Sequence, residues 1–98
     1  MTLSLLTLDP VYYPHRKSIR FFAADGFDRM LCMVSVDALR KHFGLSDSES
    51  DAAIRVAENG RHRIEEIARN KYESGATEPE GAIVLLASDF VGDVHATG

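Results

Sequence analysis

The sequence predicts an α+β domain whose elements follow the order β-β-α-α-β. Three observations support this fold class: an alternating apolar pattern on both sides of a turn at 25–28, an apolar stripe of helical period over 46–74, and a short apolar strand at 82–88. We expect a three-stranded, antiparallel-type sheet with two helices, one short and one long, packed on one of its faces. The expected parts are an N-terminal extended arm at 1–17, a single domain at 18–88 and a flexible C-terminal tail at 89–98.

The first two strands are predicted to form a β-hairpin over 18–35. Gly26 can adopt the positive φ that a type II′ turn requires at its first central position. If Asp25 lies opposite Asp28, the apolar residues pair on one side of the sheet: Ala23 with Met30, Phe21 with Cys32, and Ile19 with Val34. A slip of one residue would mix the two faces, so this pattern predicts the register as well as the hairpin.

A short helix is predicted directly after the hairpin, over 35–43. Ser35 can accept hydrogen bonds from the free N–H groups at the start of this helix, and Gly44 is suited to the left-handed conformation that often ends one. The last strand, 82–88, is apolar on both faces. Such a pattern is typical of a strand that is covered on both sides.

A long helix is predicted over 46–74. Ser46 and Glu49 have the spacing of a capping box, in which each side chain accepts a hydrogen bond from the other residue's N–H group. The pair Asn59-Gly60 is a common turn signal. The apolar stripe nevertheless keeps its helical phase across this pair, so we expect an unbroken helix in which Gly60 allows a close approach to a neighbouring element.

Composition restricts the classes of function. The net charge of −4 disfavours a general nucleic-acid binder, because such proteins neutralise phosphates. The single cysteine, Cys32, excludes an intrachain disulfide and favours a reducing compartment. The apolar start lacks the positive charge of a signal peptide, and no segment reaches the roughly 20 apolar residues that cross a bilayer. We therefore expect a cytoplasmic protein that does not contact the membrane.

No catalytic or cofactor motif is recognisable, so we predict no cofactor, no metal site and no enzymatic activity. Cys32 stands in mid-strand among apolar residues and is expected to be a buried, unreactive thiol. His62 and Glu66 are one helical turn apart and would bind a metal only with a third ligand; a surface ion pair is the simpler interpretation. Three further candidate ligands lie in the expected tail, namely Asp89, Asp93 and His95.

The outer face of the hairpin is the most informative surface. Phe22 faces Leu31 there and Arg20 faces Met33, whereas a solvated sheet face should be mostly polar. Either the N-terminal arm covers this face, or a second copy or another protein does. The residues of the arm available for this are Leu3, Leu5, Leu6 and Leu8. Our first hypothesis is a non-enzymatic interaction module that self-associates through this face.

Two other classes of function are kept as alternatives. The basic residues Arg16, Lys17 and Arg20 stand beside Tyr12 and Tyr13, a combination that can contact a nucleic-acid backbone and stack on bases. The second hypothesis is therefore a nucleic-acid-associated regulator, which the acidic composition makes less favourable. The third is a small-ligand binder or enzyme with a pocket between helix and sheet, which ranks last because no paired acid and base is visible.

A pattern of core and turn residues across 18–88 is shared with a known family. It consists of Ile19-x-Phe21-x-Ala23, Gly26, Met30-x-Cys32-x-Val34-Ser35, Ala38-Leu39 and Phe43-Gly44, followed by Asn59, Ile64-Glu65, Ala68, Gly81 and Ile83. This pattern resembles the Domain of Unknown Function 1488 family, which comprises short bacterial proteins with a small α+β fold and no established activity. The resemblance implies the fold and a bacterial cytoplasm, and it carries over no catalytic residue.

Overall fold

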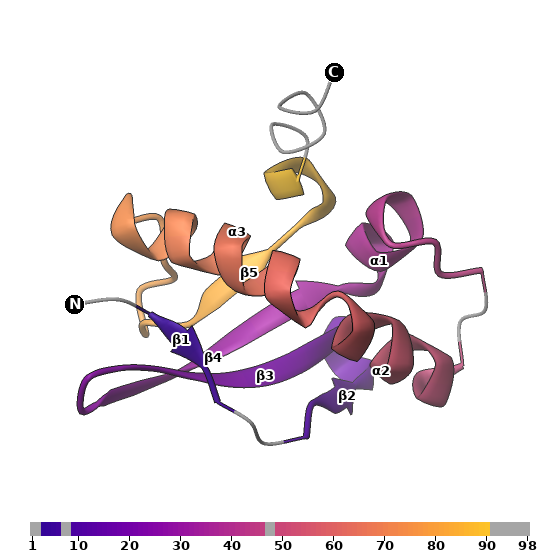
Figure 1. The fold of residues 1–98 in the computed structure, drawn as a ribbon, viewed down its shortest axis with the longest axis horizontal. Coiled ribbons are helices and arrows are strands. Elements are labelled where there is room, and N and C mark those ends of the chain that lie inside the picture. The colour runs from indigo at the N-terminus through magenta and orange to yellow at the C-terminus, as the bar shows by residue number, and fades with distance from the viewer. Residues whose placement is uncertain (1–2, 7–8, 47–48, 91–98) are drawn as a thin grey trace.

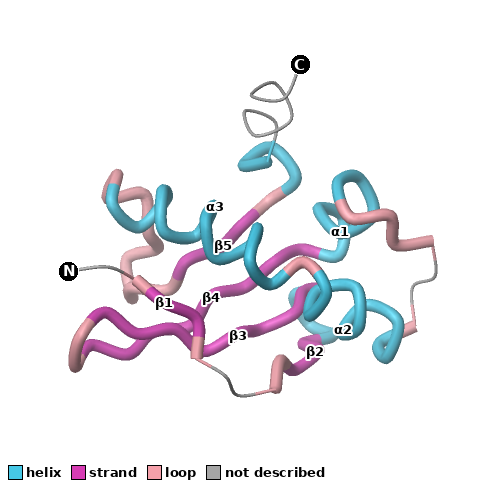
Figure 2. Tube along the Cα trace, viewed as in Figure 1, coloured by secondary structure: helices cyan, strands magenta, loops and turns pink. Residues whose placement is uncertain are grey.

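The hairpin forms the centre of the fold. In the computed structural model, which describes residues 3–6, 9–46 and 49–90, β3 (Ser18–Asp25) pairs antiparallel with β4 (Asp28–Ser35). The register is the predicted one, from the pair Asp25 and Asp28 beside the turn to the pair Ser18 and Ser35 at the far end. Gly26 has a φ of 63°, as the turn requires. The turn projects beyond the helices at the left of Figure 2.

The sheet is larger than predicted, and it is mixed rather than purely antiparallel. The arm supplies two strands, β1 (Ser4–Leu5) and β2 (Val11–Tyr13), which pair antiparallel with opposite halves of β3. On the other side β5 (Ile83–Leu85) pairs parallel with β4, which gives the order β1-β3-β4-β5 with β2 also beside β3. The pairing is parallel because the helices between β4 and β5 form a crossover that returns the chain to the starting end of β4.

The helices cover one face of the sheet, as predicted (Figure 1). The short helix α1 (Val36–His42) begins where expected, because Ser35 Oγ accepts a hydrogen bond of 3.0 Å from the N–H of Ala38. Gly44 then takes a φ of 77°, which is the left-handed geometry expected after the helix.

The predicted long helix is broken into α2 (Ser50–Asn59) and α3 (Arg61–Glu73), so the expectation of an unbroken helix is wrong. Gly60, at the break, has φ −97° and ψ 13°. The aromatic ring of Phe43 lies against it: a Cβ atom at position 60 would stand 2.3 Å from Phe43 Cε2. The expected close approach at Gly60 is therefore present, and it accompanies a kink.

The predicted capping box is also wrong. The N-cap of α2 is Glu49, and the helix begins at Ser50 rather than near Ser46. The spacing in the sequence matched the motif, but the chain enters the helix three residues later, so Ser46 stands too far upstream to accept a hydrogen bond from its first turn.

The hydrophobic core lies between the sheet and the helices. Phe21 and Ile19 of β3 are fully buried there, together with Leu3 from the arm. The helix η2 (Ala87–Phe90) adds Phe90, which is also fully buried and packs edge-on against Phe43. Residues 89 and 90, which we expected in a flexible tail, thus belong to the folded domain, and 91–98 lie outside the described residues.

Cys32 is part of this core, as expected. Its side chain is fully buried, and burial raises the pKa of the thiol to about 12, an effect that the positive charge of Lys71 only partly offsets. The thiol is therefore neutral at physiological pH and has no access to solvent, which makes it a packing residue rather than a nucleophile.

Substitution of Gly60 by alanine should lower the free energy of unfolding by about 1–3 kcal/mol, because the new methyl group overlaps the ring of Phe43. Urea unfolding measures the change. In a Phe43→Leu background the same substitution should be neutral or stabilising, since alanine is the better helix former and its φ is permitted. Equal losses in both backgrounds would contradict the proposed overlap.

The buried thiol should also make stability depend on alkaline pH. The folded state keeps the proton of Cys32 up to about pH 12, whereas the unfolded chain loses it above about pH 9. The free energy of unfolding should therefore fall across this window, by about 1 kcal/mol for the first pH unit. Urea unfolding at several pH values should show a shallower fall for Cys32→Ala, and parallel curves for both proteins would refute this assignment.

Candidate functional site

The outer face of the sheet is turned away from the helices and carries the predicted apolar residues. Phe22 pairs with Leu31 across the hairpin, and Arg20 pairs with Met33. Phe22 and Leu31 are half-buried, and Met33 is 8% exposed. Among the described residues none of these four belongs to the hydrophobic core cluster, which draws on the opposite face of the hairpin. The outer face thus has its own apolar surface.

Strands that sequence reasoning did not place there widen this surface. Val84 of β5 pairs with Met33, and Val11 of β2 pairs with Arg20, so strand alternation puts both valines on the outer face. Val11 is 48% exposed. We define the outer face by seven residues on one side of β2, β3, β4 and β5: Val11, Tyr13, Arg20, Phe22, Leu31, Met33 and Val84. Arg29, opposite Ala24, lies on the same side nearer the turn.

Two leucines of the N-terminal arm are turned away from the outer face. Leu3 and Leu5 are buried in the core on the helical side. Leu6 donates a backbone hydrogen bond of 2.7 Å to the carbonyl of Phe22, and with Phe22, Leu31 and the charged Arg29 it lines a mainly apolar pocket of about 200 Å³. Leu8 lies outside the described residues. The arm therefore borders an apolar hollow on this surface, and two of its four leucines are committed to the core.

Arg20 occupies an unusual environment on the outer face. Its guanidinium carbon lies 4.5 Å from the centre of the Tyr13 ring, a cation–π geometry that holds the charge near the β2 edge. Its Nε atom is buried and has no hydrogen-bond acceptor among the described residues. Because this atom is buried within the chain, the contact of Arg20 with Tyr13 is the interaction that positions its charge.

The predicted basic segment does not form one cluster. Arg20 belongs to the outer face, whereas Arg16 and Lys17 line a separate pocket of about 420 Å³ with Tyr12 and Arg40. Arg16 ends the short helix η1 (Pro14–Arg16). Sequence reasoning missed Arg40, because the start of α1 must bond to Lys17, as Val36 N–H does, before Arg40 comes beside the other two cations.

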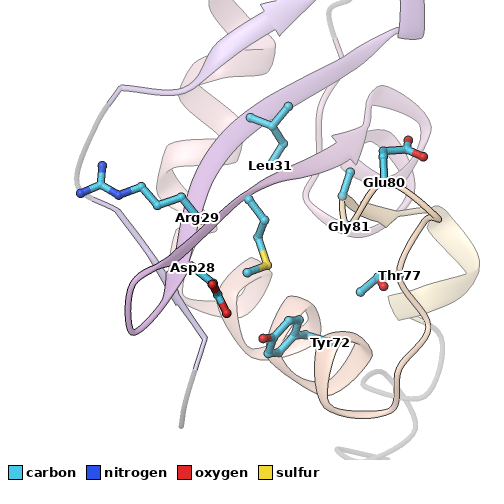
Figure 3. Close-up of a pocket in the computed structure, with 9 residues that line it drawn as sticks. Asp28, Arg29, Leu31, Tyr72, Thr77, Glu80 and Gly81 are labelled. Atoms are coloured by element: carbon cyan, nitrogen blue, oxygen red, sulfur yellow. The ribbon is translucent and has the colours of Figure 1, made fainter.

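A third pocket, of about 520 Å³, opens between the start of β4, the end of α3 and the loop before β5 (Figure 3). Tyr72 donates a hydrogen bond of 2.8 Å to Asp25 Oδ2, and this bond raises the pKa of the phenol. The carboxylates of Asp28 and Glu80 and the hydroxyl of Thr77 also line the pocket. These groups can bind a polar ligand, but Tyr72 is already engaged with Asp25, and the described residues that line the pocket include no histidine to act as a base.

The candidate metal ligands remain apart. His62 Nε2 and Glu66 Oε1 are 3.9 Å apart, and both side chains are more than half exposed, as in a surface ion pair. Asp89 is already engaged, because its Oδ2 accepts a hydrogen bond of 2.9 Å from Lys71 Nζ. Within the ranges that the structure describes, no three histidine, cysteine, aspartate or glutamate side chains lie close enough to hold a metal ion. Two further candidates, Asp93 and His95, lie outside those ranges.

Comparisons with known proteins place the chain in a family. In the described part of the chain, no helix has the length and apolar character needed to cross a membrane. No protein with a curated description matches the sequence. A crystal structure of a protein of unknown function from the DUF1488 family of Shewanella loihica PV-4 is similar, with a TM-score of 0.77 and 21% identity over 86% of this chain and 91% of that chain.

At this identity the likeness establishes the fold alone. The family is established separately by its sequence model, "Protein of unknown function (DUF1488)", which matches residues 7–85. This match includes the hairpin, all three α-helices and β5. The protein therefore belongs to the DUF1488 family, a family of unknown function.

Proposed function

We propose that the protein is a non-enzymatic interaction module that forms a homodimer through the outer face of its sheet. The observation that supports this is the apolar surface around Phe22, Leu31 and Met33, which lies outside the core cluster. In a monomer the exposed part of this surface would face water, and contact with a second apolar surface would remove it from water.

A second copy is the partner that fits this surface best. A two-fold dimer brings the same patch from both molecules together, so an apolar centre always meets an apolar centre. The charge of Arg20 is held against Tyr13 near the β2 edge rather than at Leu31, which reduces repulsion between the two copies. The hollow bordered by Leu6 has room for an apolar side chain of the opposing molecule.

We also propose that the module acts in the reducing cytoplasm of a bacterium. The support is the single cysteine, whose buried thiol needs no disulfide partner. The similar structure from Shewanella loihica PV-4 is consistent with a bacterial source.

The wild-type protein should elute as a dimer in size exclusion with light scattering, and Leu31→Glu should elute as a folded monomer. Leu31 is half-buried in one chain, so the carboxylate can reach water in the monomer but would be buried without a partner in the dimer. The dissociation constant should rise by at least about 30-fold. Met33 is less suitable as a test, because at 8% exposure a glutamate there would disturb the monomer as well.

Phe27→Glu is the matched control, because Phe27 is fully exposed in the hairpin turn and does not belong to the outer face. This variant should keep the dimer mass. A monomeric wild type, or a folded Leu31→Glu dimer, would refute the homodimer. If Leu31→Glu does not fold, as judged by circular dichroism, Leu31→Thr keeps a strand-forming side chain and should still weaken association measurably.

A further inference from the structure

A second surface lies at the other end of the hairpin from the turn, where β2 and η1 meet the start of α1. The two segments are tied together by a hydrogen bond of 2.9 Å from the N–H of Val36 to the carbonyl of Lys17. The pocket between them has a volume of about 420 Å³. This volume falls within the range of small-molecule sites, which is about 300–1,000 Å³.

The charges around this pocket are strongly one-sided. Arg16, Lys17 and Arg40 all line it and are all exposed. The one carboxylate among the lining residues, Asp37, is paired at 3.3 Å with a fourth cation, Lys41. This concentration of positive charge occurs in a chain whose net charge is −4. The pocket therefore attracts anions, although the protein as a whole repels them.

Lys17 is held in a backbone conformation that its side chain does not favour. Its φ of 45° and ψ of 56° are left-handed, and Lys17 is the one non-glycine residue with positive φ in the described part of the chain. Glycine or asparagine would adopt this conformation more easily. Lys17 is the C-cap of η1, a position where left-handed backbone is common, and its N–H group donates to the carbonyl of Pro14. A lysine in place of the favoured glycine adds a cation at the pocket.

We propose that this pocket binds a nucleoside diphosphate or triphosphate. The three cations would contact the phosphate oxygens, as arginine and lysine side chains do at other phosphate sites. Tyr12 supplies an aromatic lining residue beside them, and the volume suits a molecule of nucleotide size. The site lies apart from the outer face, so the proposal goes beyond self-association.

A small nucleotide fits these observations better than a nucleic-acid strand does. A strand needs a track of positive charge along its backbone. Here the cations converge on one pocket, and Arg20, which would have to extend the track, is turned to the outer face against Tyr13. The acidic remainder of the chain would repel the rest of a strand.

The test is calorimetric titration of the full chain with ADP at low salt, followed by thermal melting of each variant. ADP should bind the wild type with a dissociation constant below about 1 mM. Lys17→Gly should weaken binding at least 10-fold while the melting temperature holds or rises, because glycine removes the charge and relieves the positive φ at once. Arg40→Ser should weaken binding similarly.

Arg29→Ser is the control, because it removes the same charge at the opposite end of β4 and should leave the affinity unchanged. Adenosine should bind at least 10-fold more weakly than ADP, since it lacks the phosphates. The proposal is overturned if ADP does not bind at about 1 mM, or if the Lys17 and Arg40 variants bind it as the wild type does. Tighter binding of a single-stranded oligonucleotide, lost in the same variants, would overturn it in favour of nucleic acid.

Discussion

The register of the hairpin is the constraint on which the rest of this structure depends. With Asp25 opposite Asp28, the apolar residues of both strands point to one side, and the helices can close a core over them. The same register places Ser35 at the end of β4, where its hydroxyl caps α1 and sets the direction in which the chain leaves the sheet. The start of the helical layer therefore follows from the pairing of two strands.

The same pairing also divides the molecule into surfaces with different properties. Alternation sends Phe21 and Cys32 into the core and sends their neighbours Phe22 and Leu31 to the opposite face. Along the strands, the turn end carries the pocket beside Tyr72, and the other end carries the cationic pocket beside Lys17. The register determines the strand residues of the outer face, whereas the two pockets at the ends of the hairpin also take side chains from helices and loops.

Sequence reasoning reached several features that depend on residues close together in the chain, namely the hairpin, its turn and the cap of α1. The capping box at Ser46 and Glu49 has the same short range and was nevertheless wrong, because α2 begins at Ser50. The kink was missed because it accompanies a contact between Gly60 and Phe43, and no periodicity within 46–74 contains that ring. The parallel pairing of β5 was missed for the same reason, since it depends on the path of the whole crossover.

The candidate sites show the same difference between features that lie within one short segment and features that bring distant segments together. The apolar outer face could be predicted because its central residues belong to one hairpin, whereas the cationic pocket draws Arg40 from a different element than Arg16 and Lys17. Arg20 lies on the outer face opposite Met33, as the hairpin register predicted, and it therefore stands apart from Arg16 and Lys17.

The residues that carry the resemblance to the DUF1488 family are mostly those that build the core. On the hairpin the shared pattern occupies the inner positions, such as Phe21 and Cys32, and skips the outer positions Phe22 and Leu31. A pattern of this kind specifies how the sheet is covered, and it carries no information on the side chains that meet solvent or a partner. The likeness to the Shewanella protein, at 21% identity, is likewise a likeness of fold. A function for this chain therefore has to be sought on its outer face and in its cationic pocket, most of whose residues the shared pattern does not include; Ser35, which lines the pocket, is one that it does.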